Sequence, residues 1–219
     1  MSGSGGPVRF ITLEGGEGAG KSTQIKKLSE ALDAAGVDHI ITREPGGSPG
    51  AEEIRKLLVE GEPDRWDAKT EVLLHYAARR DHVRQTVKPA LKVGKWVICD
   101  RYADSTMAYQ GYGHGVNRNS IAALYGLVAD GVSADLTLVF DLPVEQGLAR
   151  AQERAEGNAE AEDRYENMDT AFHQRIRDGF LAIAKAQPDR CVLVDAAEDV
   201  DTVAAEVKRI VFEKFGIED

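Results

Sequence analysis

The chain has 219 residues, a formal net charge of −10 and 42% hydrophobic residues, which fits one large domain with a sizeable core. The negative charge argues against a nucleic-acid partner, because phosphate neutralisation needs clustered excess Lys and Arg. No apolar run approaches the roughly 18 residues that cross a bilayer, and no signal peptide is evident, so no membrane partner is expected. Cys99 and Cys191 sit in apolar runs, which predicts buried reduced thiols and a cytoplasmic protein.

In chain order, short apolar runs alternate with helical patterns. Residues 1–7 read as a flexible leader, so residues 8–219 are expected to form the single domain. The predicted strands are 8–13, 38–42, 95–100, 136–140 and 191–195. The predicted helices are 22–35, 51–60, 68–93 with a kink at Pro89, 119–129, one from 144 onward, 168–186 and 200–215. Residues 101–117, rich in Gly and Tyr, are expected to be a loop. The alternation predicts an α/β fold with a five-stranded parallel sheet and helices on both faces.

The first predicted strand runs into a glycine-rich turn that precedes a helix. Gly15, Gly20, Lys21 and Ser22 match the spacing G-x-x-x-x-G-K-[ST] of a phosphate-binding P-loop. Backbone N–H groups of such a loop point at phosphate oxygens, the lysine reaches the β- and γ-phosphates, and the serine ligates Mg²⁺. The alternative is a loop that merely turns the chain. The predicted ATP-binding residues are Gly15, Gly16, Glu17, Gly18, Ala19, Gly20, Lys21, Ser22 and Thr23.

Charged residues follow the other strands at the edge where the carboxyl ends of a parallel sheet meet. Asp100 ends an apolar strand, the usual context of the acid near Mg²⁺, although a turn or capping Asp would look the same. Arg43, Arg79 and Arg101 come from three separate segments. Each alone is more often a solvated surface charge, but together they predict a site for a second phosphate.

Two further segments are more specific than the P-loop, namely 42–47 (Thr-Arg-Glu-Pro-Gly-Gly) and 100–111, which holds Asp-Arg-Tyr and Ala-Tyr-Gln-Gly. With residues 14–22, 76–79 and 163–166, they show that the chain resembles the bacterial thymidylate kinases from Phe10 to Phe215. The resemblance implies a three-layer P-loop nucleoside monophosphate kinase fold, a homodimer, and Mg²⁺-assisted transfer of the γ-phosphoryl group of ATP to dTMP. The products would be dTDP and ADP, in dTTP biosynthesis.

The resemblance also implies roles for single residues around dTMP. Glu17 would contact the 3′-hydroxyl, Arg43 and Arg101 the phosphate, and Arg79 the thymine ring. Tyr109 would pack below the sugar and disfavour a 2′-hydroxyl, which would lose its water without a partner. The remaining pocket residues would be His75, Ser105, Thr106 and Gln110, and the metal ligands Ser22 and Asp100.

Two positions depart from the pattern. His75 stands where the family usually stacks a Phe on thymine, and it reads equally well as a core-facing helical His. Gly18 stands where the human-like subtype carries a catalytic Arg, so a cation must come from a lid at about 150–166, a charged segment rich in small residues. Arg154 is the first choice among its arginines, which also include Arg164, and Arg150 is expected over adenine.

The predicted catalytic groups are therefore Lys21, Arg101, Arg154 and Glu17, acting by positioning and charge neutralisation. One rival is a kinase for another nucleoside monophosphate. The other is a P-loop switch protein, but no Asn-Lys-x-Asp motif is present. The one Asp-x-x-Gly, at 33–36, ends a helix instead of following a strand.

Overall fold

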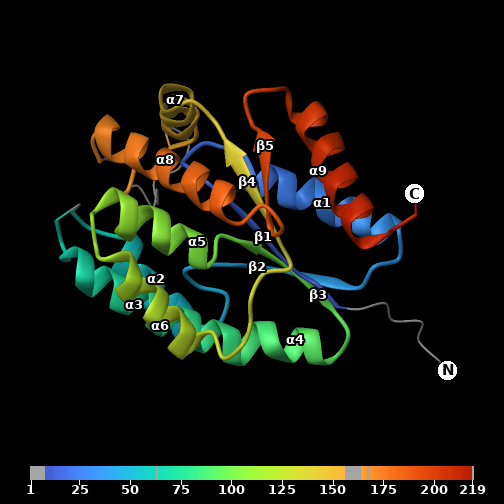
Figure 1. The fold of residues 1–219 in the computed structure, drawn as a ribbon, viewed down its shortest axis with the longest axis horizontal. Helices are drawn as coiled ribbons and strands as arrows, with labels where there is room; N and C mark the ends of the chain where they lie inside the picture. Colours follow the sequence, from blue (N-terminus) through green and yellow to red (C-terminus); the bar gives the residue numbers. More distant parts are fainter. Residues whose placement is uncertain (1–7, 63, 156–163, 167, 219) are drawn as a thin grey trace.

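The computed structural model describes residues 8–62, 64–155, 164–166 and 168–218, without the side chains of residues 154 and 155. Its centre is a parallel sheet in the order β2-β3-β1-β4-β5 (Figure 1). The strands are β1 (Phe10–Gly15), β2 (His39–Arg43), β3 (Trp96–Asp100), β4 (Leu136–Asp141) and β5 (Cys191–Asp195). The five-stranded parallel sheet predicted from the apolar runs is confirmed.

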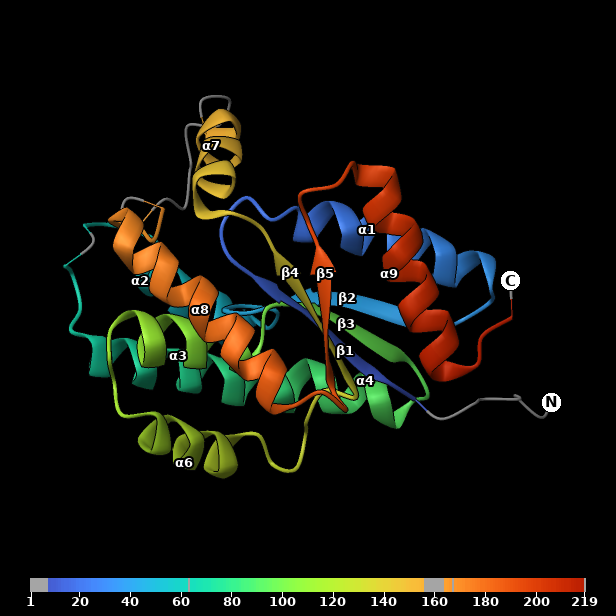
Figure 2. The ribbon, with the colours of Figure 1, turned by 45° about the horizontal axis from the view of Figure 1, so that its top comes forward.

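Helices cover both faces of this sheet, as predicted. Helices α1 and α9 lie side by side on one face, and α4 and α8 lie on the other (Figures 1 and 2). The helices are α1 (Lys21–Ala34), α2 (Pro49–Val59), α3 (Ala68–His82), α4 (Lys88–Lys92), α5 (Ala103–Thr106), α6 (Arg118–Val128), α7 (Val144–Ala155), α8 (Thr170–Ala186) and α9 (Val200–Phe215). None of the helices in the described part is both long and apolar enough to cross a membrane.

Alternate residues of β1 fill separate cores on the two faces. Ile11 and Leu13 are fully buried in the cluster that includes α1 and α9, whereas Phe10 packs in the cluster on the opposite face. Cys99 and Cys191 are buried free thiols, as the sequence predicted. Apolar side chains on both sides of the strands explain why the strands read as continuous apolar runs.

The prediction of a loop over 101–117 is wrong. After a short turn the chain forms α5 and then η2, a π-helical segment over Met107–Gly113 that packs against α8. The glycines serve this packing, because a Cβ at Gly113 would press on the Phe172 ring and one at Gly179 on the Tyr112 ring. A Gly- and Tyr-rich stretch therefore encodes a close helix contact here and not a turn.

The predicted helix over 68–93 is interrupted close to Pro89, where a kink was expected. Helix α3 passes into η1, a π-helical segment over Val83–Val87, before α4 begins at Lys88. Pro89 lies in the first turn of α4, where its missing N–H costs little. The predicted kink at Pro89 thus corresponds to a π-helical segment just before it.

The sheet register gathers the functional segments at one edge. Arg43 pairs with Asp100 across β2 and β3, and Leu13 pairs with Asp100 across β1 and β3. The loops after these strands therefore meet, as expected for an open parallel sheet. Helix α7 stands out from the body beside the loop after β1 (Figure 2).

Candidate active site

The loop between β1 and α1 has the form of a phosphate cradle closed around Lys21. The Lys21 Nζ donates to the carbonyl oxygens of Gly15, at 3.2 Å, and Gly16, at 2.9 Å. Burial, together with the nearby Arg101 guanidinium, lowers the pKa of Lys21 to about 8. The loop thus presents a buried ammonium group, and the negative charge of an incoming phosphate would stabilise its protonated form.

Gly18 lies against the backbone of α7. A Cβ at Gly18 would overlap the Gly147 carbonyl oxygen, and a Cβ at Gly147 would lie 2.5 Å from the Glu17 carbonyl oxygen. Gly18 also has φ +66°, in the left-handed region that favours glycine. This packing leaves no room for an arginine at position 18.

Ser22 and Asp100 meet at the mouth of the loop. The Ser22 hydroxyl donates to Asp100 Oδ2 at 3.0 Å. The other carboxylate oxygen, Oδ1, is buried and has no hydrogen-bond partner among the described residues. One hydroxyl and one carboxylate with a spare oxygen form an oxygen-ligand set that suits Mg²⁺.

Arg101 directly follows β3 and is held in a left-handed backbone conformation, with φ +65°. Its N–H donates to the Leu13 carbonyl oxygen at 3.0 Å, and its own carbonyl accepts the Cys99 thiol, also at 3.0 Å. The guanidinium donates to the carbonyl oxygen of Gly15 at 2.8 Å and to Ser105 Oγ at 3.2 Å. This backbone conformation, costly for a residue with a Cβ, aims the side chain at the P-loop.

Glu17 joins Arg101 to the predicted sugar site. Its Oε1 accepts from Arg101 Nη2 at 3.0 Å and from the Tyr109 hydroxyl at 2.6 Å. Burial raises the pKa of Glu17, but Arg101, Lys21 and the Tyr109 hydroxyl outweigh it and lower the pKa to about 2. Glu17 is therefore a fixed carboxylate acceptor.

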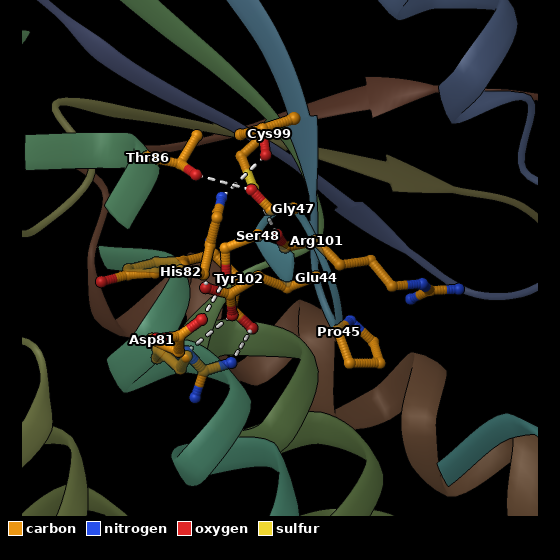
Figure 3. A network of polar contacts seen from close by, with 12 residues as sticks. Glu44, Pro45, Gly47, Ser48, Asp81, His82, Thr86, Cys99, Arg101 and Tyr102 are labelled. Atoms are coloured by element: carbon orange, nitrogen blue, oxygen red, sulfur yellow. Dashed lines mark hydrogen bonds and ion pairs between the residues drawn. The ribbon is translucent and has the colours of Figure 1, made fainter. Parts of the chain in front are cut away.

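Arg79 is buried, with 2% of its surface exposed, and Glu44 anchors it. Its Nε donates to Glu44 Oε2 at 2.7 Å, and Nη2 donates to Thr106 Oγ1 at 3.1 Å. Glu44 is held in turn by His82 Nδ1 at 2.8 Å, within the network that Figure 3 shows. Nη1 of Arg79 is buried without a hydrogen-bond partner among the described residues. It is a directed donor that lacks an acceptor.

A cavity of about 660 Å³ extends from the P-loop to Arg101 and Arg79. It includes every residue predicted for dTMP and, from the P-loop, residues 18–23 as well as Glu17. Gly15, Gly16 and Arg150 do not line it. Sequence reasoning missed seven lining residues, namely Glu44, Pro45, Arg55, Val59, Tyr102, Tyr165 and Glu166.

Two further arginines line the cavity and donate to neighbouring residues. Arg43, with about half of its side chain exposed, donates to Glu52 Oε2 at 3.0 Å. Arg55 donates to the Pro45 carbonyl oxygen at 2.6 Å. Arg55 had no sequence signal of its own, because an arginine on an amphipathic helix such as α2 usually reads as a solvated charge.

His75 faces the cavity, where its Nε2 lies 3.3 Å from the Tyr165 hydroxyl oxygen. Burial first, and then the positive charges of Arg79, Arg164 and Arg101, lower the pKa of His75 to about 3. The imidazole is therefore neutral at physiological pH. A neutral ring on the cavity wall is compatible with stacking on a base.

Replacing His75 with Phe should remove a pH dependence of stability. The unfolded state binds the His75 proton below about pH 6.5 and the folded state only below about pH 3, so its contribution to stability rises with pH between these values. At pH 5 this disfavours the folded wild type by up to about 2 kcal/mol relative to pH 7.5. Urea unfolding of both proteins at pH 5 and pH 7.5 tests this. Equal pH dependence in both would contradict it.

The arginines of the predicted lid differ in their surroundings. Arg150 Nη1 donates to the Ala196 carbonyl oxygen, just after β5, at 3.0 Å. Arg154 belongs to α7, but its side chain and residues 156–163 lie outside the described part. Arg164 is buried, pairs with Glu71, and donates to the Leu58 carbonyl oxygen at 3.1 Å. In this structure the Arg164 side chain is therefore bonded inside the protein, to Glu71 and Leu58. The lid over about 150–166 stays a prediction.

Known proteins resemble this chain over nearly its full length. The family model described as thymidylate kinase matches residues 13–207. A thymidylate kinase of Caulobacter vibrioides is 53% identical over 208 residues, covering 95% of this chain and 98% of that one. One of Ruegeria pomeroyi is 50% identical, covering 96% of each. The crystal structure of thymidylate kinase from Ehrlichia chaffeensis superimposes with a TM-score of 0.74 at 35% identity, covering 94% of this chain and 99% of that chain.

Proposed function

Because the chain belongs to the thymidylate kinase family, whose members are ATP-dependent nucleoside monophosphate kinases, we propose that it transfers the γ-phosphoryl group of ATP to dTMP. The products would be dTDP and ADP. The rival P-loop switch protein finds no support in a cavity that joins the P-loop to a second buried polar site.

One observation carries the choice of base. Arg79 Nη1, a donor, and Gln110 Oε1, an acceptor, are both buried without partners among the described residues, and both side chains line the cavity. A 4-oxo pyrimidine offers an acceptor at C4 next to the N3–H donor, so it satisfies both groups. A 4-amino pyrimidine instead offers a donor, the amino group at C4, next to an acceptor at N3. It would leave Arg79 Nη1 and Gln110 Oε1 unpaired, at a cost of about 1–3 kcal/mol each.

The acceptor phosphate and the sugar would lie between the base site and the P-loop. Arg101 donates to the P-loop carbonyl oxygen of Gly15, so its guanidinium would lie between the donor and acceptor phosphates. The Glu17 carboxylate would accept from the 3′-hydroxyl, and Tyr109 would close the side of the sugar where a 2′-hydroxyl would be. Arg43 would turn from Glu52 toward the acceptor phosphate.

Transfer itself would need no general base, since the attacking phosphate oxygen is already an anion. Lys21 and Arg101 would neutralise charge on the transferring group and hold both reactants in line. The lid, with Arg154, would supply the cation that Gly18 does not, and it would exclude water that otherwise hydrolyses ATP.

Ser22 and Asp100 fit a magnesium ion, because the buried Oδ1 of Asp100 has no hydrogen-bond partner among the described residues. They would hold Mg²⁺ through the hydroxyl and the carboxylate. The ion, when bound, would neutralise charge on the β- and γ-phosphates. The described residues contain no group of three or more His, Cys, Asp or Glu that could hold a metal ion alone, so phosphate oxygens and water would complete the ligand set.

Replacing Asp100 with Asn should raise the free Mg²⁺ concentration needed for half-maximal rate by about 10–100-fold, because the amide removes the charge that holds the ion. Initial rates at saturating ATP and dTMP over a Mg²⁺ series measure this. Asp38→Asn, an exposed carboxylate remote from the cavity, is the matched control. An unchanged Mg²⁺ requirement in Asp100→Asn would remove this residue from the metal site.

The proposed function is tested by coupled ADP release with dTMP, dUMP, UMP, dCMP and AMP as acceptors. We expect dTMP to give the highest kcat/KM, and UMP to fall below dUMP because of the 2′-hydroxyl. Stimulation by another acceptor but not by dTMP would favour the rival monophosphate kinase. We also propose a cytoplasmic homodimer, which sedimentation analysis and cell fractionation would test.

A further inference from the structure

Gln110 has only one of its two amide ends occupied. It lies in η2 and is fully buried, and its Nε2 donates to Glu71 Oε2 at 3.0 Å and to the Tyr165 hydroxyl oxygen at 3.3 Å. Its Oε1 has no partner among the described residues. An amide carries two donors at one end and an acceptor at the other, so whatever binds Nε2 decides which end is left for a ligand.

Glu71 is the group that binds Nε2. It lies in the first turn of α3 with 1% of its surface exposed. Its Oε1 accepts from the guanidinium of Arg164, and its Oε2 accepts from the Tyr165 hydroxyl at 3.3 Å as well as from Gln110. A carboxylate bonded to a guanidinium is an acceptor at both oxygens. The reversed amide would place Oε1 of Gln110 against Oε2 of Glu71, two acceptors without a proton between them.

The neighbouring groups reinforce this direction. Since the Tyr165 hydroxyl donates to Glu71, its oxygen is left to accept, both from Gln110 and from the neutral His75 ring at 3.3 Å. In each of these hydrogen bonds the donor therefore points toward the Glu71 carboxylate, directly or through the Tyr165 hydroxyl. Hydrogen bonds linked in this way strengthen one another and resist reversal of a single member.

We infer that Glu71 is a positioning residue which fixes the Gln110 amide with Oε1 toward the base, and thereby selects 4-oxo over 4-amino pyrimidines. This inference rests on the proposed function, since it deepens base recognition at the same site. Glu71 would touch no substrate. Its effect would pass through Gln110, while Arg164 and Tyr165 keep the carboxylate in place.

The test compares dTMP with 5-methyl-dCMP, which keeps the ring methyl and the sugar but reverses the pattern at C4 and N3. In Glu71→Gln the new amide can donate to Gln110 Oε1, so the Gln110 amide can turn round. We expect the ratio of kcat/KM for dTMP to that for 5-methyl-dCMP to fall about tenfold, mainly through the KM for dTMP. Glu71→Asp keeps a carboxylate acceptor and should retain the ratio even where overall activity falls.

Asp141→Asn is a control outside the base site, since Asp141 also pairs with an arginine, Arg177, at 2.7 and 3.0 Å. It should leave the ratio unchanged. A folded Glu71→Gln variant with the wild-type ratio would overturn the inference, as would an equal loss of ratio in Glu71→Asp. Should Glu71→Gln not fold, the double variant Glu71→Gln with Arg164→Gln decides, because it leaves no buried guanidinium without its carboxylate. The same fall in the ratio is expected, and an unchanged ratio would overturn the inference.

The two proposals fail in different ways. Wild-type protein that is not stimulated by dTMP would contradict the proposed function before any variant is compared. Wild-type protein that prefers dTMP, together with a folded Glu71→Gln variant that keeps the preference, would leave the function standing and remove only the role of Glu71.

Discussion

Replacing Arg101 with Gly should lower kcat with dTMP by a factor on the order of 10³–10⁵, the range associated with a transition-state arginine in phosphoryl transfer. The guanidinium donates to Gly15 in the P-loop and to Glu17, so in the proposed complex it would lie where charge develops between the two phosphates. Arg101→Lys should recover only part of the rate, because an ammonium group lacks the planar fork with which the guanidinium reaches Gly15 and Glu17 from two separate nitrogens. Steady-state kinetics with saturating ATP would measure both variants.

A second readout separates this role from folding. Arg101 has φ +65°, which glycine adopts freely and alanine does not, so Arg101→Ala should be less stable than Arg101→Gly by about 1–2 kcal/mol. Urea unfolding gives this difference. If the two variants lost the same activity while differing in stability in this direction, the activity loss would belong to the side chain. A kcat near the wild-type value in Arg101→Gly would contradict a role in transfer.

The sequence predicted the sheet and the P-loop well because both rest on local patterns. Strands that are buried on both faces require continuous apolar runs. The spacing of Gly15, Lys21 and Ser22 lies within a single loop, so it can be recognised directly in the sequence. The nine residues predicted for dTMP all line the cavity, but their contacts could not be predicted. Glu44 carries no mark in the sequence that ties it to Arg79, 35 residues away.

The error over 101–117 has a different origin. Glycine lowers helix propensity, so Gly111 and Gly113 favoured a loop when the segment was read alone. In the folded chain the missing side chain at Gly113 lets η2 pack closely on the Phe172 ring of α8. Tertiary packing thus overrides helix propensity in η2, the segment that carries Tyr109 and Gln110. Local sequence patterns alone therefore predict the wrong secondary structure for this part of the candidate site.

Arg154→Ala should lower kcat by about 10³ with little change in the KM for dTMP, because a lid arginine would act on the transferring group and not on the acceptor. Arg150→Ala is the matched control. Arg150 donates to Ala196 beyond β5, and its removal should raise the KM for ATP more than it lowers kcat. An unchanged kcat in Arg154→Ala would move the catalytic role to Arg150, since Arg164 is buried against Glu71 and Leu58.

The double variant Gly18→Arg with Arg154→Ala asks whether the P-loop can carry the missing cation, as in the human-like subtype. We expect no rescue, and a further loss of stability. Any Cβ at position 18 would overlap the Gly147 carbonyl oxygen in α7, and φ +66° disfavours a residue with a side chain. Recovery of kcat would mean that α7 can move off the P-loop at little cost. Without recovery, the contact between Gly18 and Gly147 excludes a P-loop arginine and leaves the charge to the lid.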